Sequence, residues 1–305
     1  MIPGRNTRRG PAAFLRAGAL LVLALAAASA RAEPFPTGPG QGTLNVAGEP
    51  IEIYTYKPTG YEHGPLLLVL HGLGRNAAGY RDYARPLADR YGYLVVAPLF
   101  DRKRFPAWRY QSGGITRDVS DSHEGEVRLE PESRRMGATL DALIDAVRNI
   151  EGAPALPYSV IGHSAGGQAL SRYAAFAPNQ ARRIVIANPS TYLWPTRDIR
   201  FPYGLDGLPA TLADDRALRR YFAQPIVILL GTADVKHDRN LNVRPGAIQQ
   251  GANRYERGHN FYSAAQQIAQ EHGWDFRWRL IEVPGVGHSA RRMLGADAAA
   301  AAFSD

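Results

Sequence analysis

The chain has 305 residues, of which 45% are hydrophobic and 21% are charged, with a formal net charge of +8 and no cysteine. This composition is typical of a folded globular protein, and it excludes a disordered chain, a collagen-like repeat and a coiled coil. Without cysteine the protein has no disulfides, no thiolate metal site and no cysteine nucleophile.

The N-terminal segment has the pattern of a secretory signal peptide. Three arginines among the first nine residues precede an apolar run at 17–28, and Ala30-Arg31-Ala32 follows as a small-x-small cleavage site. The alternative is a membrane anchor, but the run is too short to span a bilayer and lacks a stop-transfer flank. We therefore expect residues 1–32 to be removed and the protein to be periplasmic or secreted, with no stable membrane anchor. Arg8-Arg9 loosely resembles a twin-arginine signal, and Sec-type export is the default.

Most of the excess basic charge belongs to this segment. Residues 1–32 contain five arginines and no acid, so residues 33–305 carry 31 Lys and Arg against 28 Asp and Glu. No continuous basic stripe remains, and we expect no nucleic-acid partner. An exported protein without cysteine depends on its hydrophobic core, and not on cross-links, for its stability.

Apolar runs alternate with helical periodicity along the rest of the chain. In chain order we predict a Gly/Pro-rich surface segment at 33–50, strands at 51–56 and 66–70, a helix at 76–91, a strand at 94–97, an irregular loop at 100–131, a helix at 133–150, a strand at 158–161, a helix at 165–177, a strand at 184–187, an irregular cap-like insertion at 189–222, a strand at 226–230, a helix at 258–272, a strand at 276–283 and a closing helix at 289–303. The inner strands are continuous apolar runs, which indicates strands covered on both faces. The pattern predicts one α/β domain over residues 33–305, with a mostly parallel twisted sheet and helices on both faces.

A serine motif follows the predicted strand at 158–161. Gly162-His163-Ser164-Ala165-Gly166-Gly167 has the G-x-S-x-G pattern, in which a serine is held clear of the sheet on a strained strand-to-helix turn. Small residues two positions before and after the serine let the backbone close that turn. Ser164 is therefore the candidate nucleophile; the alternative is a Gly-rich turn with a structural serine.

A second glycine-rich turn, His71-Gly72-Leu73-Gly74, follows the predicted strand at 66–70. Glycine on both sides of Leu73 allows its backbone N–H to turn toward an anionic oxygen. Together with the N–H of Ala165 it would form a two-donor oxyanion hole. The alternative is an ordinary strand-to-helix turn, and the match gains weight only beside Ser164.

An acid and a histidine follow the last two predicted strands. Asp234 comes directly after the strand at 226–230, and His288 follows the strand at 276–283. A carboxylate that orients a histidine, which in turn takes the serine proton, is the arrangement of a serine hydrolase. Asp238, four residues further on, is the reserve acid, and Asp234 is preferred because it lies closer to its strand end.

We expect no metal and no cofactor. His123 stands near Asp118, Asp121 and Glu124, but in a polar loop without a recognised ligand spacing, so this cluster is interpreted as solvated. Ser, His and backbone donors supply the chemistry of a serine hydrolase without further groups.

Four aromatic residues fall in the two irregular segments, at Trp108, Tyr110, Tyr192 and Trp194. They are candidates to line a substrate pocket. The alternative is that they pack these segments onto the sheet, and for each residue singly this alternative is favoured.

These segments together resemble the α/β-hydrolase superfamily over nearly the whole chain after residue 32. Within it, residues 71–76, 162–167 and 188–192 are similar to secreted polyhydroxybutyrate depolymerases and feruloyl-esterase-like serine esterases. The resemblance implies an α/β-hydrolase fold, a triad of Ser164, Asp234 and His288, and oxyanion donors at Leu73 and Ala165. Secreted polymer depolymerases often carry a linker, a binding domain and disulfides, which this chain lacks. That departure favours soluble or oligomeric esters over solid polymer.

The sequence thus predicts an exported serine hydrolase that cleaves a small-molecule or oligomeric carboxylic ester through an acyl-enzyme. Two alternatives remain open. One is a serine peptidase on the same fold, and the other is a non-catalytic binding protein on a hydrolase scaffold.

Overall fold

The computed structural model describes residues 1, 2, 4, 33–120 and 125–304. Residues 32–305 form one compact unit. The predicted signal peptide therefore lies almost entirely outside the described residues, as do Asp121, His123 and Glu124 of the acidic loop.

The described residues contain one sheet of eight strands, in the order β1-β2-β4-β3-β5-β6-β7-β8. Its strands are β1 (Gly38–Val46), β2 (Glu49–Lys57), β3 (Leu66–Leu70), β4 (Leu94–Pro98), β5 (Tyr158–His163), β6 (Ile184–Ala187), β7 (Ile226–Gly231) and β8 (Arg279–Val283). The pairs formed by β1 with β2 and by β2 with β4 are antiparallel, and all the other pairs are parallel. The mostly parallel sheet that the sequence predicts is confirmed.

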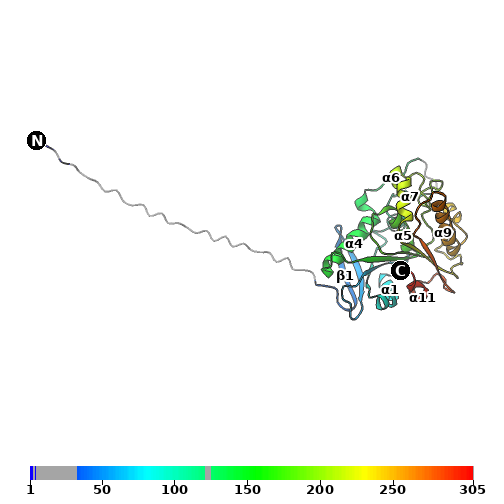
Figure 1. Ribbon diagram of the computed structural model, residues 1–305, viewed down its shortest axis with the longest axis horizontal. Helices are drawn as coiled ribbons and strands as arrows, with labels where there is room; N and C mark the ends of the chain where they lie inside the picture. Colours follow the sequence, from blue (N-terminus) through cyan, green and yellow to red (C-terminus); the bar gives the residue numbers. More distant parts are fainter. Residues whose placement is uncertain (3, 5–32, 121–124, 305) are drawn as a thin grey trace. The chain divides into compact units, whose positions relative to one another are not determined.

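Helices cover both faces of this sheet (Figure 1). They are α1 (Ala77–Tyr83), α2 (Arg85–Tyr91), α3 (Ala107–Tyr110), α4 (Met136–Glu151), α5 (Ala165–Phe176), α6 (Ala210–Ala213), α7 (Asp215–Phe222), α8 (Pro245–Ile248), α9 (Arg254–Glu271), α10 (Ala290–Leu294) and α11 (Asp297–Ala300), with a short 3-10 turn at Glu132–Arg134. One face carries α4, α5, α7 and α9, and the other carries α1, α2, α10 and α11.

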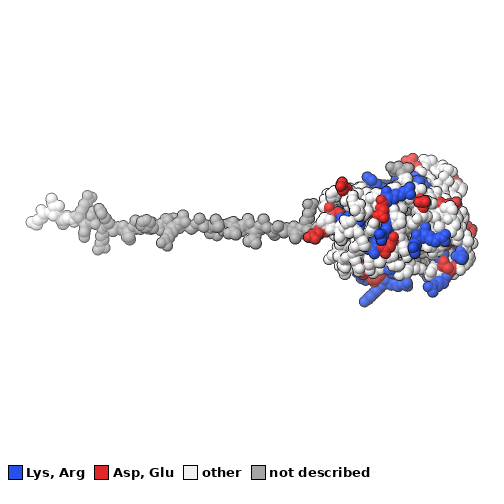
Figure 2. Space-filling view, turned by 90° about the horizontal axis from the view of Figure 1, so that it is seen from below, with Lys and Arg blue, Asp and Glu red and all other residues white. Residues whose placement is uncertain are grey.

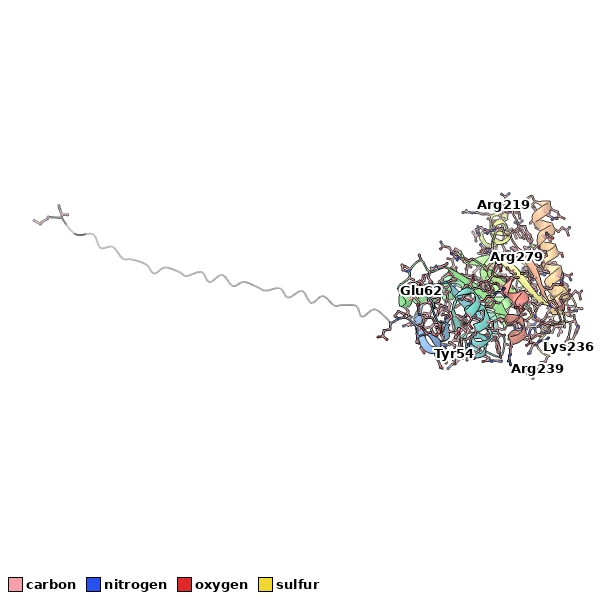
Figure 3. All side chains as sticks on the ribbon, turned by 60° about the horizontal axis from the view of Figure 1, so that its bottom comes forward. Tyr54, Glu62, Arg219, Lys236, Arg239 and Arg279 are labelled. Carbon is pink, nitrogen blue, oxygen red and sulfur yellow. The ribbon has the colours of Figure 1, made fainter. Side chains whose placement is uncertain are left out.

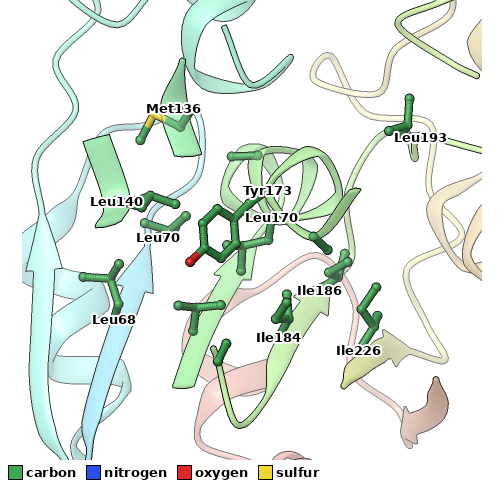
Figure 4. Close-up of a cluster of buried hydrophobic side chains, with 14 of the residues drawn as sticks. Leu68, Leu70, Met136, Leu140, Leu170, Tyr173, Ile184, Ile186, Leu193 and Ile226 are labelled. Atoms are coloured by element: carbon green, nitrogen blue, oxygen red, sulfur yellow. The ribbon is translucent and has the colours of Figure 1, made fainter. Parts of the chain in front are cut away.

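The core has two layers because successive side chains of a strand point to opposite faces. In β3, Leu66, Leu68 and Leu70 pack under α4 and α5, whereas Leu67 and Val69 pack under α1 and α2. All five are at most 1% exposed, so β3 is buried on both faces, as its apolar run indicates. Figure 4 shows part of the first layer, including Met136 and Leu140 of α4 and Leu170 and Tyr173 of α5.

The prediction of an irregular surface segment at 33–50 is wrong in part, because half of the segment forms the edge strand β1. β1 pairs with β2 through a tight turn at Ala47 and Gly48, whose φ angles are +51° and +83°. The glycines and proline of β1 have low β-propensity, which hid the strand from the sequence. Pairing with β2 and burial of Val46 outweigh that local preference.

Two predicted helices are each divided into two. The helix at 76–91 breaks at Ala84, because Pro86 has no N–H to donate and fits only the first turn of α2. The closing helix at 289–303 is interrupted at Gly295, which ends α10.

The insertion at 189–222 is less irregular than expected, since its last third forms α6 and α7. The last strand begins at Arg279 and not at 276. The segment before it is held by Phe222 of α7, whose ring centroid lies 6.1 Å from that of Phe276 and 5.8 Å from that of Trp278. The N–H of Arg277 donates to the carbonyl oxygen of Phe222, at 3.0 Å, so this segment pairs with the end of α7 and not with a neighbouring strand.

The surface carries charges of both signs. On the face shown in Figure 2, basic side chains are interspersed with acidic ones. Lys236 and Arg239, in the loop between β7 and α8, lie near each other at the outside of the molecule (Figure 3). Among the described residues, no helix combines the length and the apolar character needed to cross a membrane.

Candidate active site

Ser164 occupies the sharp turn between β5 and α5. Its φ and ψ angles are +58° and −116°, a conformation that non-glycine residues rarely adopt. The surrounding structure holds this strained residue in place: its N–H donates to the carbonyl oxygen of Ala187, at 2.9 Å. A Cβ on Gly162 would lie 2.4 Å from the backbone carbon of Gly166, so the turn closes only with glycine at this position.

Ser164 forms a hydrogen-bonded chain with the two residues predicted beside it. Its Oγ lies 3.0 Å from Nε2 of His288, and Nδ1 of His288 lies 2.7 Å from Oδ2 of Asp234. A carboxylate only accepts, so Nδ1 carries the hydrogen and Nε2 is left free to accept the serine proton. Asp234 is 1% exposed, whereas the His288 side chain is 19% exposed and reaches solvent.

The parallel sheet explains why residues so far apart in sequence meet. Ser164, Asp234 and His288 follow β5, β7 and β8, whose carboxyl ends lie at the same edge. Asp238 does not hydrogen-bond His288. It binds Arg254 in a bidentate pair, at 2.8 and 2.9 Å, and this guanidinium lowers the pKa of Asp238 to about 2. The structure thus places the preferred acid, and not the reserve acid, on the histidine.

The turn that contains Leu73 lies directly against Ser164. A Cβ on Gly72 would be 3.5 Å from the Cβ of Ser164 and 2.8 Å from the Tyr80 hydroxyl. Ala165 begins α5, where the helix N-terminus concentrates unpaired N–H groups and positive potential. The turn that carries Leu73 and the first residue of α5 therefore both lie next to the serine.

Segment 100–110 holds this turn in place. The N–H of Phe100 donates to Nε2 of His71, at 3.1 Å, so the other ring nitrogen carries the hydrogen and donates to Gly72 O at 3.0 Å. Burial lowers the pKa of His71 to about 4, which keeps the ring neutral. Tyr110 donates its hydroxyl hydrogen to the carbonyl of His71, at 2.6 Å. Arg75 donates to the carbonyls of Phe100 and Phe105, at 2.7 and 2.9 Å.

Removing one of these contacts is expected to loosen the oxyanion turn. Tyr110→Phe leaves the buried carbonyl of His71 without its donor, and we expect kcat to fall roughly tenfold at a nearly constant KM. Tyr221→Phe is the matched control, because its buried hydroxyl donates to Leu193 O, away from the serine. Both variants lose a buried hydrogen bond, about 1–3 kcal/mol. Steady-state kinetics and urea unfolding separate the two effects, and an equal kcat loss in both variants would contradict the role of Tyr110.

The four aromatic candidates do not gather into a visible pocket. Tyr110 and Tyr192 are fully buried, and Tyr192 stacks on Phe261 with ring centroids 4.5 Å apart. Trp108 is half-buried beneath the guanidinium of Arg117, and Trp194 is half-buried against the core. This placement fits the packing alternative for Tyr110 and Tyr192, and neither belongs to an exposed lining of the site.

Two further residues lie near the triad: His163, which the sequence places in the elbow, and Arg254, which the sequence reasoning missed. His163 is buried with its ring 4.7 Å from that of His288, and burial, followed by the charge on His288, lowers its pKa well below the usual value. Arg254 is fully buried and lies 3.5 Å from Asp234. The helix predicted at 258–272 begins four residues earlier in the structure, at Arg254, so the sequence reasoning did not see a cation in its first turn, where it opposes the helix dipole and needs an acidic partner.

The described residues contain no group of three or more His, Cys, Asp or Glu side chains placed to hold a metal ion. Three members of the cluster around His123 lie outside the described part of the chain, and the interpretation of that cluster as solvated stays a prediction.

The fold and the chain from Ser164 through His288 to Asp234 define the class, an α/β serine hydrolase. No family model and no curated protein matches the sequence. Solved structures do match. LpqC, a poly(3-hydroxybutyrate) depolymerase from Bordetella parapertussis, is 33% identical, with a TM-score of 0.77 over 86% of this chain and 89% of that one. Poly(aspartic acid) hydrolase-1 from Sphingomonas sp. KT-1 is also 33% identical, with a TM-score of 0.76 over 85% and 96% of the two chains.

The siderophore hydrolase EstB from Aspergillus nidulans is 16% identical, with a TM-score of 0.50 over 87% of this chain and 94% of that one, and shares the fold. The first two structures are similar enough in sequence and coverage to establish the relationship. The chain belongs to the α/β-hydrolase superfamily, and at that level it is a serine hydrolase.

Proposed function

We propose that the protein is an exported serine hydrolase that cleaves carboxylic esters through an acyl-enzyme intermediate. The observation that carries this proposal is the hydrogen-bonded chain of Ser164, His288 and Asp234 on a strained strand-to-helix turn, at 3.0 and 2.7 Å. This arrangement has the nucleophile, base and orienting acid that acyl transfer requires.

In the first half of the reaction, Nε2 of His288 takes the proton of the Ser164 hydroxyl as Oγ attacks the ester carbonyl carbon. The backbone N–H groups of Leu73 and Ala165 donate to the oxyanion of the tetrahedral intermediate. As the intermediate collapses, the imidazolium gives its proton to the leaving alkoxide, and the alcohol departs. Asp234 stabilises the imidazolium throughout.

In the second half, His288 activates a water molecule, which attacks the acyl carbon and releases the carboxylic acid and the free serine. No cofactor takes part in either step. In this proposal the chemistry is carried by the side chains of Ser164, His288 and Asp234 and by the two backbone N–H groups.

An ester is proposed as the substrate because its alkoxide leaves more easily than an amine, which must be protonated before it departs. The name of the first relative, a poly(3-hydroxybutyrate) depolymerase, supports this choice. The second relative is named for a polymer of an amino acid, which keeps amide cleavage as the second candidate. A small or oligomeric ester remains the proposed substrate form.

Export is part of the proposal and rests on the residues of the N-terminal segment alone. The arginines, the apolar run and the small-x-small site support removal of residues 1–32 and a location in the periplasm or outside the cell. The intact mass of the protein recovered from its native compartment tests this, since cleavage after Ala32 leaves Glu33 as the first residue.

The substrate class is tested with a matched pair, a p-nitrophenyl ester and a p-nitroanilide that share one acyl group. We expect ester turnover to exceed anilide turnover by at least about 10²-fold. A fluorophosphonate should also add to Ser164, as located by peptide mass, and Ser164→Ala should neither label nor turn over. Comparable anilide turnover would replace the ester with an amide. A folded protein that takes no label would support the non-catalytic binding protein.

A further inference from the structure

Arg254 is a buried cation between two carboxylates. It begins α9 and is fully buried, and its guanidinium donates to both oxygens of Asp238, at 2.8 and 2.9 Å. The same Nη1 lies 3.5 Å from Oδ1 of Asp234, the residue that holds His288. A single guanidinium therefore joins a half-buried carboxylate to the carboxylate of the triad.

Local structure does not favour an arginine at this position. A positive charge in the first turn of an 18-residue helix faces the positive end of the helix dipole. Burial of a guanidinium is costly unless its charge is compensated. Arg257, one turn further on, is also buried, but it donates to the backbone carbonyls of Gly251 and Ser190. Of these two arginines, only Arg254 contacts carboxylates, so the negative charges of Asp238 and Asp234 compensate its positive charge.

Asp234 needs this cation for a reason of its own. Its Oδ2 accepts from His288, but its buried Oδ1 has no hydrogen-bond partner in the described structure. Two other titratable groups that the structure describes beside the triad, His163 and Tyr192, supply no positive charge. The ring of His163 is held neutral by burial, and burial followed by the charge of Asp234 raises the pKa of the Tyr192 hydroxyl well above its usual value. Arg254 is thus the cation that faces the free oxygen of Asp234.

We propose that Arg254 is a positioning residue of the triad: it faces the free oxygen of Asp234 and keeps this carboxylate oriented toward His288, and together with Asp238 it sets the pH at which the site becomes active. This inference rests on the proposed function. The sign follows from Coulomb's law. The charge of Arg254 disfavours the imidazolium form of His288, and the charge of Asp238 favours it. The two residues therefore act on the protonation of the triad in opposite directions.

The test is the pH midpoint of the acid limb of kcat/KM in four variants. Arg254→Met removes the cation and should raise the midpoint by roughly 0.5 to 1 pH unit, with kcat about tenfold lower. Asp238→Asn should lower the midpoint by a similar or smaller amount. Arg254→Lys keeps the charge and should keep the midpoint. The double variant, Arg254→Met with Asp238→Asn, removes both charges, and its midpoint should lie close to that of the parent protein.

Asp238→Asn keeps the proposal open to contradiction even if the variants without Arg254 do not fold, because in it the buried Arg254 still faces the carboxylate of Asp234, at 3.5 Å. Arg257→Met is the matched control. It removes a buried arginine from the next turn of the same helix, and the pH midpoint of this variant should move less than half as far. Midpoints that stay at the parent value in the single variants, or that move in the same direction in both, would overturn the proposal.

The rate of fluorophosphonate labelling of Ser164 is measured over the same pH range. This readout needs an assembled triad but no particular substrate, so it separates two failures. If the parent labels but turns over no ester, the proposed function fails, and the labelling midpoints still decide the role of Arg254. If the parent turns over ester and the midpoints do not move, only the role of Arg254 fails.

Discussion

Asp234→Asn is expected to lower kcat by about 10⁴-fold while leaving the fold intact. The asparagine amide donates where the carboxylate accepts, so it favours the His288 tautomer with its hydrogen on Nε2. That nitrogen, which lies 3.0 Å from the Ser164 hydroxyl, then has no lone pair to accept the serine proton. Ester turnover by the purified variant measures the effect, and circular dichroism checks that the protein is folded.

Asp238→Asn is the matched control for this prediction. Asp238 lies four residues further along the same loop, and it hydrogen-bonds Arg254 and not His288. At the pH optimum we expect kcat to change by less than about threefold. A loss of about 10⁴-fold in Asp238→Asn, with Asp234→Asn nearly unaffected, would show that Asp238 is the acid and that the arrangement seen here is not the active one.

Gly166→Ala is expected to have the largest effect on folding. A Cβ at this position would lie 2.4 Å from the carbonyl oxygen of Leu70 and 2.8 Å from its carbon, and both are backbone atoms of the central strand β3. Helix α5 would have to move off the sheet, which we expect to cost about 3 kcal/mol or more. The better helix propensity of alanine returns only about 1 kcal/mol of this.

The loss should appear as a drop in melting temperature of roughly 5 °C or more. Activity should fall with it, because α5 carries the N–H of Ala165 toward the site. Gly42→Ala is the control: its Cβ would meet no atom within 4 Å, and no change beyond about 0.5 kcal/mol is expected. A Gly166→Ala protein as stable as the parent would mean that α5 is not packed on β3 as closely as described.

The sheet was predictable because each inner strand is a short apolar run between polar segments. A strand that is buried on both faces needs such a run, and the run can be recognised in the sequence without knowing how the rest of the chain packs. β1 was missed because its residues resemble a loop, and only pairing with β2 makes them a strand. The single helix predicted at 76–91 failed at Pro86, whose preference for the first turn of a helix was given too little weight.

The residues of the candidate site also fall into those that the sequence could predict and those that it could not. Ser164 stands on a local strand-turn-helix motif, and Asp234 and His288 come directly after strands, so the rule that parallel strands end at one edge brings them together. The aromatic residues could not be assigned in this way. Tyr110 faces the carbonyl of His71 and Tyr192 faces Phe261, contacts that depend on how two irregular segments fold back over the sheet.

The sequence by itself determined the class of fold, the elbow at Ser164 and the order of serine, acid and histidine. These depend on local backbone preferences and on the period of apolar residues, which a few neighbouring positions encode. Only the tertiary structure decided that Asp234 contacts His288, that Asp238 contacts Arg254, and that Tyr110 supports the oxyanion turn. Those contacts join side chains that lie far apart along the chain, and their geometry is set by the packing of whole helices and loops around the sheet edge.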